Sequence, residues 1–141
     1  MRKKEDITKE EWIPLKEYEI PKGEFFITSF NRNVENTKIV LENDDYVVEI
    51  FFEMIPVLQQ VCLEIARMDT WGSVQVKYGK YVFENFFFEI KNSNICDWLI
   101  EESGGFYSHQ DLKHYCIVTG EDVADIVSLI EPSVRVTKQE N

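Results

Sequence analysis

The sequence predicts an α+β domain, with a mostly antiparallel sheet of about five to seven strands and about two or three short helices packed against it. The chain has 141 residues, 44% of them hydrophobic, so it can bury one core but is too short for two ordinary domains. Aromatic residues reach 13%, which favours strands. Most apolar segments are short and end at turn-forming residues, as in antiparallel hairpins. The single domain should cover residues 11–138, after a charged, disordered N-terminus at residues 1–10.

The first part of the domain reads as a series of strands. Strand 24–30 follows a Lys-Gly turn, and an Asn-rich loop separates it from strand 37–41. An acidic turn over residues 42–45 leads into strand 46–53. Because the strands on either side of this turn are short and apolar, we expect them to form an antiparallel hairpin.

Residues 56–67 fit two structures. Their apolar residues recur at helical spacing, and Pro56 would stand near the first turn, where its missing N–H costs little. The alternative is a strand with Val61, Leu63 and Ile65 on one face. The spacing favours the helix, and the strand remains the alternative.

Residues 71–77 and 81–90 read as two strands joined at Tyr78 and Gly79. The second of these strands is very aromatic and has apolar residues on both of its faces. A strand of that kind is typically central in its sheet and covered on both sides.

A short helix is predicted over residues 95–102. The Asn-Ser-Asn segment at 92–94 supplies helix-capping side chains before it, and a glycine pair ends it. Ile95, Trp98 and Leu99 fall on one side of this helix, which we expect to be buried.

The C-terminal part predicts a strand, a helix and a strand. Residues 106–112 form a loop, and residues 114–118 form a short strand. Thr119 can then cap a helix that runs to Pro132, with apolar residues at helical spacing. Its buried stripe would be Val123, Ile126, Val127 and Ile130. Residues 133–137 form the last strand, so this unit predicts a small crossover with parallel pairing.

The formal net charge is −11, from 15 Lys and Arg against 26 Asp and Glu. A chain this acidic should bind neither nucleic-acid phosphates nor an anionic membrane surface through its overall field. No apolar segment approaches the roughly 20 residues of a membrane helix, and no secretory signal opens the chain. The three cysteines are widely spaced and contain no Cys-x-x-Cys pair, which favours a reducing cytoplasm.

One segment gathers residues with chemical potential: His109, Asp111, His114 and Cys116. Histidine and thiolate side chains bind Zn²⁺ and act in general base catalysis, so these four residues define an alternative catalytic or metal site. Their spacing matches no familiar zinc motif. The structural alternative is that they shape a turn and a strand, with hydrogen bonds to nearby backbone.

The other catalytic patterns are missing from the sequence. No serine lies in a Gly-x-Ser-x-Gly turn, the glycine pair lacks the Lys-Ser/Thr of a phosphate-binding loop, and no calcium-binding loop occurs. We therefore predict no catalytic residue, cofactor or metal ion for the leading hypothesis.

The leading hypothesis is a non-catalytic module that binds a basic partner protein, reached by electrostatic steering. Acidic residues near 42–45, 97–102 and 121–125 would form its surface, with aromatic anchors in turns and loops. The candidate binding residues are Asp44, Asp45, Tyr78, Glu101, Glu102, Phe106 and Tyr107.

In size, acidity and lack of a catalytic motif, the chain resembles bacterial immunity proteins, although no motif carries the likeness. The resemblance implies an immunity or antitoxin protein that neutralises a basic nuclease or other toxin, and nucleic-acid-mimicking inhibitors fit the same description. Two other hypotheses stay open: a small metal-dependent or Cys/His hydrolase, and a structural subunit whose partner is its own copy.

Overall fold

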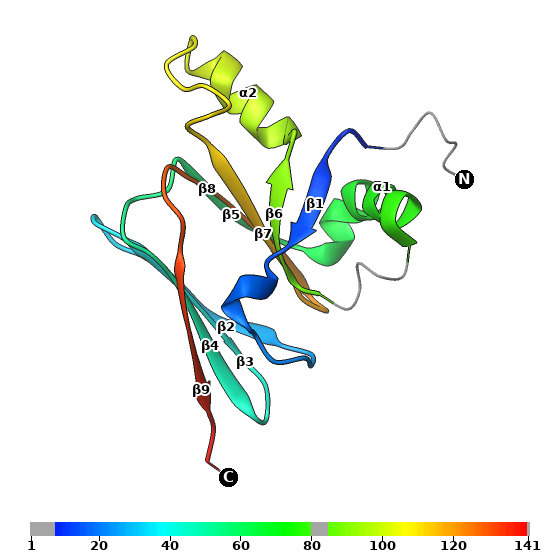
Figure 1. Ribbon diagram of the computed structural model, residues 1–141, viewed down its shortest axis with the longest axis vertical. Coiled ribbons are helices and arrows are strands. Elements are labelled where there is room, and N and C mark those ends of the chain that lie inside the picture. The colour runs from blue at the N-terminus through cyan, green and yellow to red at the C-terminus, as the bar shows by residue number, and fades with distance from the viewer. Residues whose placement is uncertain (1–7, 80–84, 141) are drawn as a thin grey trace.

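The computed structural model describes residues 8–79 and 85–140, which form two antiparallel sheets and two α-helices in layers (Figure 1). The five-stranded sheet has the order β1-β6-β7-β8-β5, and the four-stranded sheet has the order β2-β3-β4-β9. The strands are β1 (Glu11–Pro14), β2 (Phe26–Arg32), β3 (Thr37–Glu42), β4 (Tyr46–Phe52), β5 (Leu58–Leu63), β6 (Phe87–Lys91), β7 (Lys113–Val118), β8 (Asp122–Ser128) and β9 (Ser133–Lys138). The helices are α1 (Met68–Tyr78) and α2 (Asn94–Glu102), with short 3-10 helices η2 (Lys16–Tyr18) and η3 (Glu64–Arg67).

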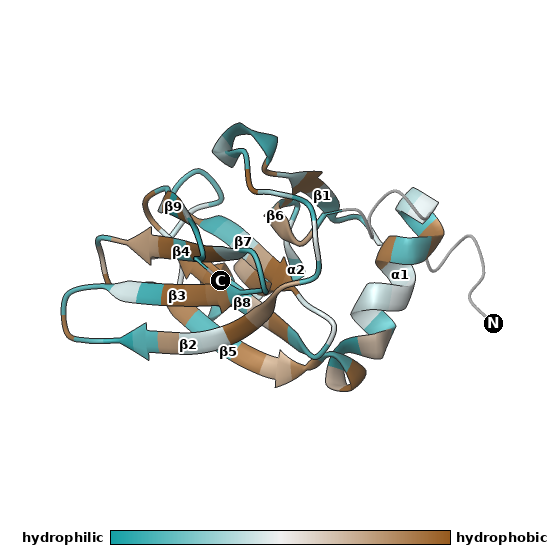
Figure 2. Cartoon of the chain, turned by 90° about the horizontal axis from the view of Figure 1, so that it is seen from below, coloured by the Kyte–Doolittle hydropathy of each residue, from teal (hydrophilic) through white to brown (hydrophobic). Residues whose placement is uncertain are grey.

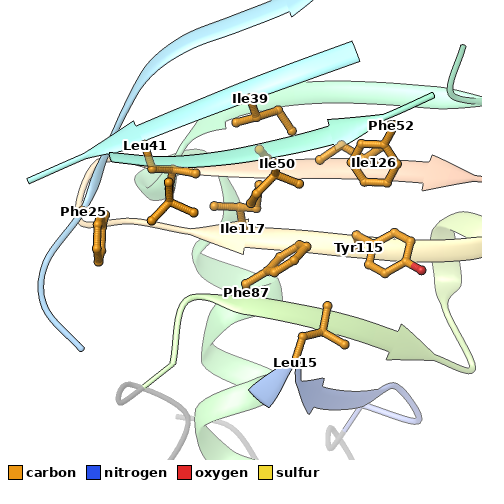
Figure 3. Packing of buried hydrophobic residues seen from close by; sticks show 12 residues of the cluster. Leu15, Phe25, Ile39, Leu41, Ile50, Phe52, Phe87, Tyr115, Ile117 and Ile126 are labelled. Carbon is orange, nitrogen blue, oxygen red and sulfur yellow. The ribbon is translucent and has the colours of Figure 1, made fainter. Parts of the chain in front are cut away.

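The main hydrophobic core lies between the two sheets (Figure 3). The four-stranded sheet supplies residues such as Ile39 and Ile50, and the five-stranded sheet supplies residues such as Ile117 and Ile126. All four of these side chains are fully buried. They alternate along their strands with residues that face away, so the pleat of each sheet determines which side chains enter this core.

The two α-helices cover the other face of the five-stranded sheet. Trp71 and Val74 of α1 pack on Phe88 and Val118, and Leu99 of α2 packs on a cluster that contains Val127 of β8. The central strands β7 and β8 are therefore buried on both faces, between the second sheet and the helices.

The α+β prediction holds at the coarse level of a mostly antiparallel fold with two helices in one domain. The described residues contain nine strands in two sheets, more than the single predicted sheet of about five to seven. The predicted strands 24–30, 37–41, 46–53, 114–118 and 133–137 correspond to β2, β3, β4, β7 and β9. The hairpin of β3 and β4 is confirmed by a regular antiparallel register from Thr37↔Phe52 to Glu42↔Val47.

The predicted strand 71–77 is wrong, because these residues belong to helix α1. Trp71 and Val74 lie three residues apart, on the face that packs against the five-stranded sheet. Val74 and Val76 favour a strand locally, and tertiary packing overrides this preference. Gly79 ends the helix with a φ of 67°. The predicted strand 81–90 is confirmed only in its last part, as β6, and residues 81–84 lie outside the described residues.

The preferred helix over residues 56–67 is also wrong, and the strand alternative is correct. Residues 58–63 form β5, which pairs with β8 from Leu58↔Val127 to Leu63↔Asp122. Only residues 64–67 are helical, as η3. A short apolar segment can satisfy both the helical and the strand pattern, and pairing with the neighbouring strand β8 decides for the strand.

The predicted helix after Thr119 is a strand, β8, so the proposed parallel crossover is an antiparallel hairpin of β7 and β8. The Thr119 hydroxyl accepts a hydrogen bond from the Asp122 N–H at 2.9 Å, as a helix cap would, but it closes a hairpin turn. Because β8 is buried on both faces, its apolar residues occur at every spacing, including the helical one. After β8 the chain crosses to the second sheet as β9.

Helix α2 confirms the prediction over residues 95–102. Ser93 caps it, because its Oγ accepts a hydrogen bond from the Cys96 N–H at 3.1 Å. Gly104 follows the helix with a φ of 64°, a conformation that favours glycine. The prediction that Trp98 lies on the buried side is wrong, because 54% of its surface is exposed.

Candidate functional site

A buried chain of polar side chains lies on the helix-covered face of the five-stranded sheet. The ring of His114, on β7, stands between two partners: its Nδ1 is 2.7 Å from Ser93 Oγ, and its Nε2 is 2.8 Å from Asp125 Oδ1. Each ring nitrogen therefore has a hydrogen-bond partner, and Nε2 donates its proton to the Asp125 carboxylate. Ser93 in turn accepts from Cys96, so each of these atoms has a partner.

Asp125 is the most strongly bound member of this chain. Its side chain is fully buried on β8, and Oδ2 forms a salt bridge with Arg67 of η3 and accepts a hydrogen bond from Gln60 Nε2 at 3.0 Å. Burial alone would raise the pKa of Asp125, but the hydrogen bond and charge of His114 and the charge of Arg67 hold this pKa far below its usual range. Asp125 therefore remains a carboxylate at neutral pH.

The order Ser93, His114, Asp125 resembles a Ser-His-Asp catalytic triad in composition but not in geometry. In the serine protease triad the serine faces Nε2 and the aspartate faces Nδ1, whereas this ring is reversed. The Ser93 residue is only 3% exposed, and its Oγ already caps α2. A nucleophile in this position has no room for a substrate, so these side chains do not provide an active site. Their hydrogen bonds and salt bridge instead connect α2, β7, β8 and η3.

The residues of the alternative catalytic site are not brought together. His114 and Cys116 share the buried face of β7, as predicted for a strand, whereas His109 is exposed and its Nε2 lies 2.7 Å from Asp97 Oδ1 on α2. Asp111 accepts hydrogen bonds from the backbone and side chain of Ser108, as in the predicted turn. Over residues 8–79 and 85–140, no group of three His, Cys, Asp or Glu side chains is placed to hold a metal ion.

Burial also makes Cys116 a poor nucleophile. Its thiol is fully buried, and this burial raises its pKa well above the usual value, with the charge of Asp125 as a further cause. The three cysteine thiols are all free.

The predicted binding residues fall into separate regions. Asp44 and Asp45 form the turn between β3 and β4, where the Asp45 carbonyl accepts from Gln139 N–H near the C-terminus. Figure 1 shows α2 at the opposite end of the molecule from this turn. Tyr78 lies at the end of α1, where its hydroxyl accepts a hydrogen bond from the Trp12 N–H at 3.0 Å. Within the acidic segment 121–125, Asp125 is buried and belongs to no surface.

The remaining candidates, Glu101, Glu102, Phe106 and Tyr107, lie on α2 and the loop after it. Together with the exposed Trp98 they form what we call the α2 surface. Phe106 is 78% exposed and stacks edge-on against Tyr107, with ring centroids 5.1 Å apart. Tyr107 is half-buried and packs with Leu99 against the sheet. Its ring therefore provides a fixed contact for the exposed ring of Phe106. The α2 surface therefore presents two large exposed rings beside two exposed carboxylates.

Sequence reasoning missed Trp98 as a surface residue. Helical spacing places it one turn before Glu101 and Glu102, on the side away from Cys96 and Leu99. The available signal was that α2 has more apolar residues than one buried stripe requires, so one of them had to face outward.

A nearby pair of contacts neutralises another acid of α2. Asp97 forms a salt bridge with Lys9 and a hydrogen bond with His109. The hydrogen bond from Lys9, followed by that from His109, lowers the pKa of Asp97. Glu101 and Glu102 form no salt bridge with a lysine or arginine of the described residues, so they carry the acidic character of this surface.

The structure is thus a two-sheet α+β fold with exposed aromatic and acidic side chains on the α2 surface. Comparison with protein-family models, with curated proteins and with solved structures finds no match to the chain. None of the helices described is long and apolar enough to cross a membrane.

Proposed function

We propose that this chain is a non-catalytic module that binds a basic partner protein through the α2 surface. The observation that carries the proposal is the exposure of Trp98 and Phe106, at 54% and 78%, beside the carboxylates of Glu101 and Glu102. Tryptophan is enriched among residues that dominate binding energy, and it loses little side-chain entropy on binding.

The charge of the protein supports a basic partner. The net charge is −11, and the acidic pair of the α2 surface would meet lysine or arginine side chains at the rim of an interface. Rim charges chiefly raise the rate of association, whereas the rings would supply most of the affinity. An immunity or antitoxin protein that neutralises a basic toxin is the biological role that fits this chemistry.

Free cysteine thiols support a reducing compartment for this role. Two of the three, Cys96 and Cys116, are buried, and none forms a disulfide. We accordingly propose that the protein is cytoplasmic.

The test uses a defined probe population: a displayed library of random peptides, selected against the immobilised protein. The selected peptides should be rich in Lys and Arg beside apolar residues. Binding of a selected peptide should weaken by about 2 kcal/mol or more in Trp98→Ala and in Phe106→Ala, as for other interface anchors. Val34→Ala is the matched control, because Val34 is 82% exposed in the loop between β2 and β3, outside the α2 surface.

A second pair of variants tests the acidic rim at equal change of net charge. Glu101→Gln/Glu102→Gln should slow association and flatten its dependence on salt between about 50 and 500 mM. Asp44→Asn/Asp45→Asn removes the same charge from the opposite end of the molecule and should leave the salt dependence nearly unchanged. Equal effects of both pairs, or selection of acidic peptides only, would contradict the proposal.

A further inference from the structure

Strand β5 forms an open edge of the five-stranded sheet. It pairs with β8 on one side, and no described strand pairs with its other side. Natural edge strands are usually protected by charged residues, proline or a bulge. The segment Leu58–Leu63 contains neither a charged residue nor proline, and its register with β8 is regular. The outward N–H and C=O groups of β5 are thus available to another strand.

Apolar side chains continue this edge into η3 and α1. Leu63 is 63% exposed, Ile65 72% and Met68 64%, and Val61 lies two residues before Leu63 on the same face of β5. Leu63, Ile65 and Met68 line a hollow of about 410 Å³ together with Gly120 of the β7–β8 turn. Figure 2 shows β5 at the border of the molecule, with hydrophobic residues toward its end.

The surroundings of this edge are acidic. Glu64 follows β5 directly, and its N–H donates to the carbonyl of Glu121 at 2.8 Å, which joins the two segments. Both glutamates line the hollow, and neither forms a salt bridge with a lysine or arginine of the described residues. A second copy of the chain would bring the same carboxylates to the contact, whereas a partner with lysine or arginine would neutralise them.

We infer that the β5 edge binds an extended segment of a partner protein, which adds a further strand to the five-stranded sheet. The segment alternates apolar residues with Lys or Arg. Its backbone hydrogen-bonds to β5, its apolar side chains cover Leu63 and Ile65, and its cations meet Glu64 and Glu121. This surface is separate from the α2 surface, so either proposal can fail alone.

The experiment titrates the isotope-labelled full chain with a synthetic peptide that alternates lysine and valine. The amide resonances of β5 should shift, and their hydrogen exchange should slow on binding. The same peptide methylated at alternate backbone nitrogens, on the edge that would face β5, should bind at least about tenfold more weakly. A peptide that alternates glutamate and valine is the charge control and should not bind.

Variants of the protein locate the contact. Leu63→Lys places a charge on the edge at a side chain that is mostly exposed, so the fold should remain intact by circular dichroism, and peptide affinity should fall at least about tenfold. Glu64→Gln/Glu121→Gln leaves the edge intact and should weaken binding several-fold, with a smaller salt dependence. Trp98→Ala should leave peptide binding unchanged.

Three results would overturn the inference. The first is equal affinity for the methylated and unmethylated peptides, and the second is full affinity in Leu63→Lys. The third is a concentration-dependent dimer in light scattering that Leu63→Lys abolishes, because the edge would then serve a second copy of this chain.

Discussion

Removal of Arg67 from its salt bridge with Asp125 should destabilise the fold more than removal of Asp125. Asp125 is fully buried, whereas 16% of the Arg67 side chain is exposed. If Arg67 is replaced by methionine, the carboxylate cannot reach water, and its remaining polar partners are His114, Gln60 and the Cys116 thiol. If Asp125 is replaced by asparagine, the guanidinium can turn outward into solvent. The two substitutions therefore break one contact at unequal cost.

The magnitude follows from this difference. Leaving a buried charge without its partner costs about 3–5 kcal/mol, so Arg67→Met should lower the free energy of unfolding by about this amount. Asp125→Asn should cost about 2–3 kcal/mol, because it mainly replaces a charged hydrogen-bond acceptor with a neutral one. For a chain of this size, each kcal/mol corresponds to roughly 3–5 °C in Tm, so Arg67→Met should lower Tm by more than about 10 °C.

The assay is urea unfolding followed by tryptophan fluorescence, on both single variants and on the double variant. The double variant should cost less than the sum of the single variants by at least about 1 kcal/mol, because the second substitution removes a charge that the first has left unpaired. Arg135→Met is the control: Arg135 pairs with Glu49 on the surface and is 74% exposed, so the loss should stay below about 1 kcal/mol. Additive single effects, or a cost of Arg67→Met equal to the control, would refute the reasoning.

Three further predictions concern single groups. Because the pKa of Asp125 is lower in the folded state, its stabilisation is complete above about pH 5 and is lost as the pH falls below about 4, so the stability difference between wild type and Asp125→Asn should shrink there in urea melts. Burial raises the pKa of Cys96 and Cys116, so Ellman's reagent should modify half-exposed Cys62 first and these two only on unfolding; equal rates in the native state would contradict this. Gly104→Ala should cost about 1 kcal/mol in thermal unfolding, from its φ of 64° alone, since open space surrounds this position; an unchanged Tm would exclude backbone strain there.

The part of the fold that could be predicted from the sequence is the part with local signals. The β3–β4 hairpin has short apolar strands on either side of a polar turn, and α2 has a serine cap and a glycine end. In each of these elements the local sequence preference agrees with the structure that the tertiary contacts require.

The misread elements are those for which distant partners decide the structure. Helix α1 depends on Trp71 packing against Trp12, at a ring separation of 5.7 Å, and β5 depends on pairing with β8. The turn at Thr119 shows why such errors persist, because its hydroxyl makes the same short-range hydrogen bond in a hairpin as in a helix cap. A local contact of this kind cannot distinguish the two folds.

The exposure of the candidate surface residues could be predicted from the sequence, whereas the buried polar side chains could not. Phe106 and Glu101 could be named because loop aromatics and helix-end acids are exposed in most folds. Asp125 could not, because a helical reading of residues 119–130 places it on the solvent side, opposite the apolar stripe. In the strand it shares a face with Val123 and Val127 and enters the interior. Its cationic partner is 58 residues away in the chain, beyond the reach of any local pattern.

The two proposed surfaces are connected through β5, because one end of this strand lies near α2. Leu58, at the start of β5, packs in the same cluster as Leu99 of α2, whereas Leu63, at its end, lies beside η3 and the β7–β8 turn. A strand added along β5 would therefore have one end near α2. A partner that joined such a strand to a basic domain would bind both surfaces at once, and the second contact would form at high effective concentration. Loss of either surface would then weaken the complex far more than it weakens binding of a short peptide to the other, which separates one bivalent partner from two independent ones.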